Sequence, residues 1–243
     1  MERLDGKVAV VTGGSRGIGQ ATARRLAADG SAVVVSYTSR EAGAQETVAS
    51  IIEGGGRAVA VRADMADPDA LDGLFAAVTD EFGGFDILVN NAGTLTISPL
   101  AETSDGELDR VFTVNTFGTF RALRHAARSI RDGGRIVNVS TAVTAHPAGG
   151  LSVYSGSKAA VEEFTKSLAH ELAPQLVTVN TVCPGPTDTD MLDAEFREAA
   201  ASWSVFNRLA AAEDIADVIS LVASDRARWL TGQTIHASGG HVM

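Results

Sequence analysis

The residues whose types and spacing could do chemistry are a tyrosine and a lysine in the stretch VYSGSKAA, residues 153–160. Tyr154 and Lys158 are four positions apart, so on a helix both side chains lie on one face. A phenol with its ordinary pKa of about 10 exchanges protons poorly at neutral pH. The Lys158 ammonium, together with a positively charged ligand, would lower that pKa. The pair therefore predicts a tyrosine that gives a proton to a substrate oxygen or removes one from it.

A glycine-rich turn near the N-terminus has the pattern of a phosphate-binding loop. TGGSRGIG, residues 12–19, directly follows the apolar run KVAVVT and directly precedes a predicted helix. Glycines let the backbone turn sharply and bring its N–H groups close to a pyrophosphate, and the positive end of the helix dipole lies at the same place. The turn therefore predicts nucleotide binding by Gly13, Ser15, Arg16, Gly17, Ile18 and Gly19.

Short apolar runs rich in β-branched residues recur along the chain. They lie at 7–12, 31–37, 57–63, 85–90, 134–140, 176–182 and 232–237. They are continuous rather than alternating, which is typical of strands buried on both faces of a parallel sheet. Helical stretches separate them, at 17–30, 39–56 and 66–84, and Ser104 with Glu107 predicts a capping box that opens a helix running towards Arg131. This alternation predicts an α/β fold, a single Rossmann-like doubly wound parallel sheet of about seven strands with helices on both faces, over residues 1–243.

Several motifs occur in an order and at spacings that resemble the short-chain dehydrogenase/reductase family. They are NNAG at 90–93, the G-x-x-x-G-x-G spacing of the loop, Asn115, and Tyr154-x-x-x-Lys158. The resemblance spans essentially the whole chain, from LDGKVAVV to LTGQTIHASGG. Within the family it is nearest to the 3-oxoacyl-carrier-protein reductases, the broader ketoreductases and the sugar dehydrogenases. Gln175 stands where the carrier-protein reductases usually have an arginine, which weakens the fatty-acid interpretation.

The resemblance implies the roles of the catalytic residues. Asn115 matches the residue that kinks a helix and helps to hold a proton-relay water, and Lys158 matches the one that holds the nicotinamide ribose hydroxyls beside the acid/base Tyr154. The family places a serine thirteen positions before the tyrosine, where this chain has Thr141, with Ser140 one residue earlier. A threonine hydroxyl donates the same hydrogen bond, and strand alternation would send the two side chains to opposite sides. Thr141 is therefore favoured for the serine role, and Ser140 is the alternative.

A further set of residues would surround the dinucleotide, again by resemblance. Asp64 matches the position that bonds the adenine amino group, with the Met65 backbone beside it, and the segment lining the adenosine ribose corresponds to Asn91, Ala92 and Gly93.

CPGPTDTDM, residues 183–191, resembles the family segment that borders the nicotinamide. Pro184 and Gly185 would flank the ring, while the backbone of Thr187 and the hydroxyl of Thr189 would meet its carboxamide. We expect the irregular piece that follows, 186–207, to form a lid over the substrate. Its few apolar side chains suit a small or medium, partly apolar carbonyl compound.

The end of the second predicted strand bears on the choice of cofactor. In dinucleotide folds an acidic residue at this place bonds the ribose 2′-hydroxyl and repels a 2′-phosphate. Here the position holds Tyr37, and no carboxylate follows before Glu41. A phosphate would instead meet donors and positive charge from Arg16, Thr38, Ser39 and Arg40. The sequence therefore favours NADP(H) over NAD(H).

Composition and charge exclude several classes of function. The formal net charge of −10 disfavours a nucleic-acid or anionic-membrane partner. No apolar run reaches the roughly 18 residues that would suggest a membrane span, and the N-terminus lacks the layout of a signal peptide. The five histidines lack metal-ligand spacing, so no metal is expected, and the single cysteine, Cys183, suits the cytoplasm.

Three functions remain open from the sequence. An NADP(H)-dependent carbonyl reductase is favoured, a sugar or alcohol dehydrogenase would use the same site in the opposite direction, and a non-catalytic dinucleotide-sensing protein is the alternative from another class. Small and apolar residues on more than one side of the helix that carries Tyr154 suggest packing against a second subunit. Family members are mostly tetramers, so we expect a homotetramer or homodimer.

Overall fold

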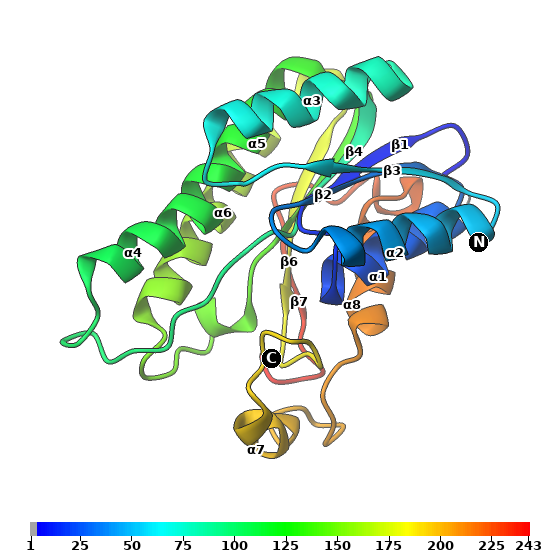
Figure 1. The fold of residues 1–243 in the computed structure, drawn as a ribbon. Helices are drawn as coiled ribbons and strands as arrows, with labels where there is room; N and C mark the ends of the chain where they lie inside the picture. The colour runs from blue at the N-terminus through cyan, green and yellow to red at the C-terminus, as the bar shows by residue number, and fades with distance from the viewer. Residues whose placement is uncertain (1–3) are drawn as a thin grey trace.

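Seven short strands form one parallel sheet in the computed structural model, which describes residues 4–243 (Figure 1). The strands are β1 (Val8–Val11), β2 (Ala32–Tyr37), β3 (Arg57–Arg62), β4 (Phe85–Asn90), β5 (Ile130–Val139), β6 (Thr178–Pro184) and β7 (Thr234–Ala237). Their order across the sheet is β3-β2-β1-β4-β5-β6-β7, and every neighbouring pair is parallel. The predicted fold class, a doubly wound Rossmann-like sheet, is confirmed.

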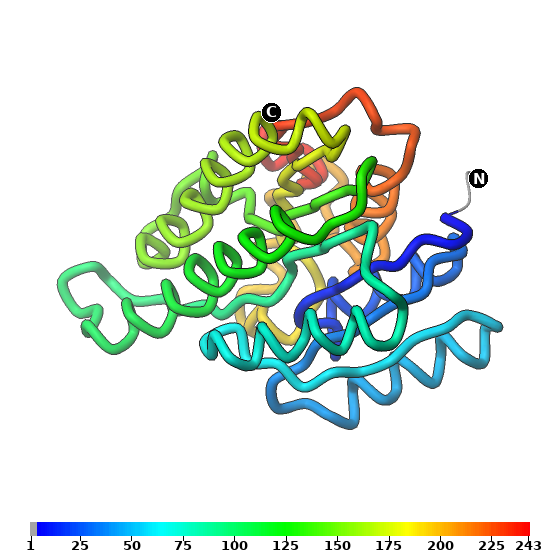
Figure 2. Tube along the Cα trace, turned by 90° about the horizontal axis from the view of Figure 1, so that it is seen from above, coloured from blue at the N-terminus to red at the C-terminus, as the bar shows by residue number. Residues whose placement is uncertain are grey.

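Helices cover both faces of this sheet, as the continuous apolar strands require. One face is covered by α1 (Gly17–Ala28), α2 (Glu41–Glu53) and α8 (Ala212–Val222), and the other by α3 (Pro68–Phe82), α5 (Thr119–Ser129) and α6 (Ser152–Glu171) (Figures 1 and 2). Strand β1 shows the division, because Val8 and Val10 enter one hydrophobic cluster while Ala9 and Val11 enter the other. Each strand therefore supplies two cores at once.

The strand order reverses at β1, which lies between β2 and β4. Ala9 is in register with Val33 of β2 on one side and with Ile87 of β4 on the other. In open α/β sheets, ligands bind beyond the carboxyl ends of the strands at such a reversal. The predicted site residues follow those strand ends, so the fold gathers them at one edge.

The capping box is present, but the helix after it is not continuous. Ser104 Oγ accepts from the Glu107 N–H at 3.2 Å, and the Glu107 carboxylate accepts from the Ser104 N–H at 3.0 Å. Helix α4 (Asp105–Phe112) then passes into a wide π-turn, residues Thr113–Gly118, before α5 begins.

The prediction that the helix runs towards Arg131 is wrong at its C-terminal end. Helix α5 ends at Ser129, because β5 begins at Ile130 and not at the predicted residue 134. Ile130 pairs with Phe85 of β4, and Arg131 reaches Asp86 at 2.8 Å and the carbonyl of Phe82 at 3.1 Å. A register shift after Phe85 lets this early part of β5 join the sheet. Tertiary pairing therefore draws these residues out of the helix.

The segment 186–207 contains short helical turns rather than being wholly irregular. A 3-10 turn spans Ala194–Phe196 and helix α7 spans Arg197–Ala201. Cys183, the first residue of the CPGPTDTDM segment, still belongs to β6. In Figure 1 the segment lies past the carboxyl ends of the strands, beneath β6 and β7.

Candidate active site

The glycine loop is held against the end of β4 by a network around Thr12. Thr12 Oγ1 accepts from the backbone N–H groups of Asn91 at 3.0 Å and Ala92 at 3.1 Å. The Asn91 side chain donates back to the carbonyls of Thr12 at 2.9 Å and Gly13 at 3.1 Å. Asn91 and Ala92 were predicted to line a ribose, and the structure gives the Asn91 amide the task of fixing the loop.

Two glycines of the loop are required by close approach. A Cβ at Gly13, whose φ is +67°, would come within 2.9 Å of Ala92 Cα. A Cβ at Gly19 would come within 2.3 Å of the Gly13 carbonyl oxygen. The loop therefore forms a tight backbone turn at the start of α1, and its N–H groups fit a pyrophosphate there.

The end of β2 presents donors and no carboxylate. Tyr37 is 9% exposed and its side chain belongs to the hydrophobic core. Thr38 donates to the carbonyl of Ala63 at 3.4 Å, and Ser39 is exposed beside it. Asp64 accepts from the Ala66 N–H at 2.9 Å, while Met65 is buried. A ribose at this place would therefore meet hydroxyls and arginines.

Arg16 of the glycine loop and Arg40 at the start of α2 meet at one carboxylate. Arg16 Nη1 lies 3.3 Å and Arg40 Nη1 lies 2.8 Å from the same oxygen, Oδ2 of Asp190. The two guanidinium groups hold the pKa of Asp190 below its usual range. All three side chains are about half exposed. Sequence reasoning found both arginines and missed Asp190. This residue belongs to the TDTDM motif, but nothing in the motif indicates a contact with Arg16 or Arg40.

Helix α6 carries Tyr154 and Lys158 on one face, as the spacing predicted. Lys158 is 4% exposed, and its ammonium donates to the carbonyl of Val139 at 2.8 Å. Burial, which penalises the charged form, lowers the pKa of Lys158 to about 8. Its Nζ also lies next to Gly93, where a Cβ would come within 3.2 Å. The lysine is thus fixed between the ends of β4 and β5.

Burial also raises the pKa of Tyr154 to about 12, although a hydrogen bond with Thr141 acts in the opposite direction. In the protein alone, loss of water around the phenol outweighs any effect of a nearby positive charge. The prediction also included the positive charge of a bound ligand, so an acidic phenol in that complex stays a prediction. At neutral pH Tyr154 carries its proton.

Ser140 and Thr141 point in different directions, as strand alternation suggested. The Ser140 hydroxyl donates to Glu162 Oε1 at 2.6 Å, away from the phenol. The Thr141 hydroxyl lies near enough to the Tyr154 phenol to lower its pKa, and Thr141 Oγ1 accepts from the Val143 N–H at 3.3 Å. Of the two candidates, the structure brings only Thr141 to the tyrosine.

Glu162 is a second residue that sequence reasoning missed. It lies one helical turn after Lys158 and contacts Cys183 Sγ at 3.6 Å as well as Ser140. Burial, followed by the Glu162 carboxylate, raises the pKa of Cys183 to about 12, so the cysteine is an unreactive thiol. The i, i+4 spacing from Lys158 was the available sequence signal.

Asn115 sits in the π-turn between α4 and α5 and is fully buried. Its side chain accepts from the Thr94 N–H at 2.8 Å and donates to the Thr94 carbonyl at 2.9 Å and to Ser157 Oγ at 3.0 Å. Ser157 in turn donates to the Tyr154 carbonyl at 2.7 Å. The amide therefore joins the chain after β4 to the first turn of α6, and the expected distortion of the helix is present.

The end of β6 and the start of the 186–207 segment close the other side. A Cβ at Gly185 would come within 2.9 Å of the Ser238 backbone, so the chain after Pro184 passes tightly against the C-terminal tail. Thr187 Oγ1 donates to the Gly185 carbonyl at 2.9 Å. The methyl group of Thr189 lies next to Gly17 of the glycine loop. These residues complete a groove lined by Arg16, residues 93–97, Met191 and Asp193.

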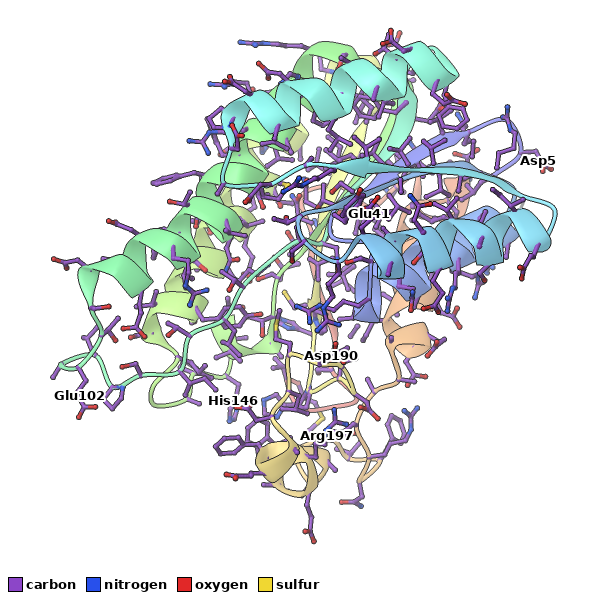
Figure 3. All side chains as sticks on the ribbon, in the orientation of Figure 1. Asp5, Glu41, Glu102, His146, Asp190 and Arg197 are labelled. Atoms are coloured by element: carbon purple, nitrogen blue, oxygen red, sulfur yellow. The ribbon has the colours of Figure 1, made fainter. Side chains whose placement is uncertain are left out.

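Aromatic rings from three segments meet at the edge of this region. His241 of the C-terminal tail stacks on Trp203 of the 186–207 segment with ring centroids 5.3 Å apart, and its ring lies 4.7 Å from that of His146. Burial, and then the neighbouring His146, lower the pKa of His241. Figure 3 shows His146 on the same side as Asp190 and Arg197. The three rings link the loop after Thr141 to the segment that would cover a substrate.

Two further features concern metals and membranes. Within residues 4–243, no three histidine, cysteine or carboxylate side chains gather as metal ligands would. The same residues contain no helix that is both long and apolar enough to cross a bilayer.

Comparison with known proteins matches this architecture along nearly the whole chain. Residues 13–241 match a family profile described as enoyl-(acyl carrier protein) reductase. Versicolorin reductase from Emericella nidulans is 40% identical over 255 residues, which cover 98% of this chain and 96% of that protein. A short-chain dehydrogenase from Burkholderia cenocepacia, solved in complex with NADP, is 41% identical with a TM-score of 0.95, covering 98% and 99% of the two chains. The angucycline C-6 ketoreductase LanV, also with bound NADP, is 38% identical with a TM-score of 0.94, covering 98% and 96%.

Proposed function

Because this chain belongs to the short-chain dehydrogenase/reductase family, we propose that it is an NADP(H)-dependent ketoreductase in which Tyr154 is the general acid. The observation that carries the proposal is the proximity of the Thr141 hydroxyl to the Tyr154 phenol, on the helix that carries the buried Lys158. A phenol and a hydroxyl that already meet can bind one carbonyl oxygen between them.

The cofactor proposal rests on the residues around the glycine loop. Arg16 and Arg40 converge on one anion, and β2 ends without the carboxylate that would repel a 2′-phosphate. Two related structures were solved with NADP bound. When bound, NADPH supplies the hydride that reduces the carbonyl carbon. NADP(H) is therefore favoured over NAD(H).

The protonation states suit reduction. The Tyr154 phenol, with a pKa of about 12, is protonated at neutral pH and can give its proton to the substrate oxygen as the hydride reaches the carbon. Thr141 donates the second hydrogen bond to that oxygen, and Lys158 holds the ribose hydroxyls and offsets the negative charge left on the phenol. A sugar or alcohol dehydrogenase, which would use the phenolate at the same site, is the alternative, and the redox poise of the cofactor pool decides between the two directions.

For the substrate we propose a ketone with an aromatic or otherwise flat apolar body. The relatives include a protein named as a versicolorin reductase and one named as an angucycline C-6 ketoreductase. In this chain the stacked rings of Trp203 and His241, with His146 beside them, offer flat surfaces near the groove. The 186–207 segment serves as the lid over that substrate.

We also propose that the protein is a cytoplasmic homotetramer or homodimer. Phe117 and Phe120 around the start of α5 are 50% and 45% exposed, and Phe120 packs edge-on against Phe164 of α6. An apolar surface across two helices is suited to burial against a second subunit.

A carbonyl panel measured with NADPH and NADH, on the wild type and on Tyr154→Phe, tests the proposal. We expect faster turnover with NADPH and a loss of about a thousandfold in kcat for Tyr154→Phe, with NADPH binding retained. Full activity in Tyr154→Phe would exclude the phenol as the acid. Cofactor binding with no turnover on any carbonyl would favour the dinucleotide-sensing alternative.

A further inference from the structure

The contact between Asp190 and the two arginines has a consequence for cofactor choice. Arg16, Arg40 and Asp190 come from three places far apart in the sequence, with 174 and 150 residues separating Asp190 from the two arginines. Both guanidinium groups point at the same carboxylate oxygen. A carboxylate held this way occupies the position of an anionic ligand, and it is supplied by the chain itself.

We propose that Asp190 is a specificity-determining residue whose carboxylate competes with the cofactor's 2′-phosphate for Arg16 and Arg40. The inference rests on the proposed use of NADP(H). Because the carboxylate is part of the chain, it is always present at a high effective concentration. NADPH must displace it, whereas NADH has no 2′-phosphate and need not.

The charges at this place support displacement rather than sharing. Two guanidinium groups carry two positive charges, and Asp190 neutralises one of them. A phosphate monoester adds a charge of about −1.5 to −2 at neutral pH. With Asp190 retained the four groups would sum to a net negative charge of about −0.5 to −1, and with Asp190 displaced the remaining three sum to between about 0 and +0.5. Phosphate and carboxylate therefore repel each other at the arginines.

The position of Asp190 in the chain gives this competition a second effect. Asp190 directly follows Thr189, whose methyl group lies next to Gly17 and whose carbonyl accepts from Arg197 Nη2 at 3.2 Å. Figure 3 shows Asp190 in the segment above Arg197. Displacement of the Asp190 carboxylate therefore releases one attachment of the 186–207 segment, near the residue predicted to meet the nicotinamide carboxamide. A 2′-phosphate bound at one end of the cofactor site acts on the lid at the other.

Direct binding measurements on Asp190→Asn test the competition without turnover. The substitution keeps the shape of the side chain and removes its charge. We expect the Kd for NADPH and for adenosine 2′,5′-bisphosphate to fall about three- to tenfold, since each exposed ion pair contributes little. The Kd for NADH and for adenosine 5′-monophosphate should change by less than about twofold. Tighter binding of all four nucleotides alike, or weaker binding of NADPH, would overturn the proposal.

Asp188→Asn is the matched control. Asp188 lies two residues earlier in the same segment and pairs with Arg197, not with Arg16 or Arg40. The Asp188→Asn substitution removes the same charge from the protein and loosens the same segment. Because Asp188 does not pair with the two arginines, the ratio of the NADPH and NADH dissociation constants should stay at the wild-type value. A shift equal to that of Asp190→Asn would attribute the effect to net charge or general loosening and overturn the specific role of Asp190.

The chain has two tryptophans, and this allows displacement to be observed directly. Trp203 belongs to the 186–207 segment and Trp229 is 95% exposed elsewhere. In a Trp229→Phe background, adenosine 2′,5′-bisphosphate should change the emission of Trp203, while adenosine 5′-monophosphate should not. Adding Asp190→Asn should remove the difference. Equal responses to both nucleotides in the Trp229→Phe protein would contradict displacement.

These outcomes separate the inference from the proposed function. If the wild type binds neither NADPH nor adenosine 2′,5′-bisphosphate, the cofactor assignment itself fails. If it binds both and Asp190→Asn leaves the ratio unchanged, only the competition is wrong.

Discussion

The two ends of the candidate site are built differently. At the catalytic end Lys158 and Asn115 are buried and hydrogen-bonded to backbone groups of neighbouring elements. At the adenosine end Arg16, Arg40 and Asp190 are about half exposed and hold one another through charged side-chain hydrogen bonds. Exposed ion pairs are weak and screened by salt, whereas buried polar groups are costly to disturb. The proposed chemistry therefore lies where the structure is fixed, and the proposed cofactor discrimination lies where single substitutions can adjust it.

The largest effect that would test this contrast is expected from Lys158→Met. Removing the ammonium should lower kcat/KM at least about a thousandfold, because it abolishes both ribose binding and charge stabilisation. The same change removes the cost of burying the lysine charge, about 3 kcal/mol as judged from the shift of its pKa from 10.5 to about 8. It also leaves the Val139 carbonyl without its hydrogen-bond donor, which lowers stability. We expect a net gain of about 1 kcal/mol in the free energy of unfolding at pH 7, measured by urea denaturation. A loss of stability would show that the buried charge is well compensated.

Thr141→Ala should follow in size, with Ser140→Ala as its control. Loss of a hydrogen-bond donor to the substrate oxygen lowers kcat by about a hundredfold. Ser140 faces Glu162, so its truncation should cost less than about tenfold in kcat and about 1 kcal/mol in stability. Steady-state kinetics on both variants checks this. A larger loss for Ser140→Ala would reverse the assignment of the serine role.

The pH dependence should show one descending limb in kcat/KM for NADPH, which reports the free enzyme. The Lys158 ammonium loses its proton above a pH of about 8, so kcat/KM should fall towards tenfold per pH unit beyond it, while Tyr154 keeps its proton to about 12. The effect of pH on stability has the opposite sign to its effect on the rate. Between pH of about 8 and 10.5 the unfolded chain binds more protons at Lys158 than the folded protein does. The cost of burying the charged lysine therefore disappears as the pH rises. The stability advantage of Lys158→Met should therefore shrink over that window. A flat rate profile to pH 10 would contradict the lowered pKa.

Arg40→Ala should have the smallest effect and should act only on the exposed end. We expect NADPH to bind about fivefold more weakly, with NADH binding and the pH profile unchanged. Titration of both cofactors by fluorescence at low and high salt checks this, because the difference should shrink as salt screens the charges. An equal loss for NADH would mean that Arg40 supports the loop rather than the phosphate.

The sequence could predict the sheet because its strands are apolar on both faces, and it could predict the loop, Tyr154 and Lys158 because each is a local pattern. The boundary of β5 was missed because Ile130 and Arg131 are drawn to Phe85 and Asp86 by tertiary pairing. The family spacing led to Thr141 with Ser140 as the alternative, and the structure distinguishes them by the nearness of Thr141 to Tyr154 and the contact of Ser140 with Glu162. The partner of Arg16 and Arg40 was not predictable, since contacts across 150 residues or more leave no local signal. Burial around Tyr154 was likewise invisible in the spacing.

The place of β1 in the middle of the sheet matters for how the chain is made. Its neighbour β4 follows 78 residues later, as the bond from the Val8 N–H to Asp86 records. At a synthesis rate of roughly 5–20 residues per second, β4 emerges from the ribosome about 4–16 s after β1. Until then VAVV, which ends buried on both faces, has one backbone edge unsatisfied. The first strand that the cell makes thus keeps one open backbone edge for several seconds of synthesis, and aggregation of the growing chain would begin there.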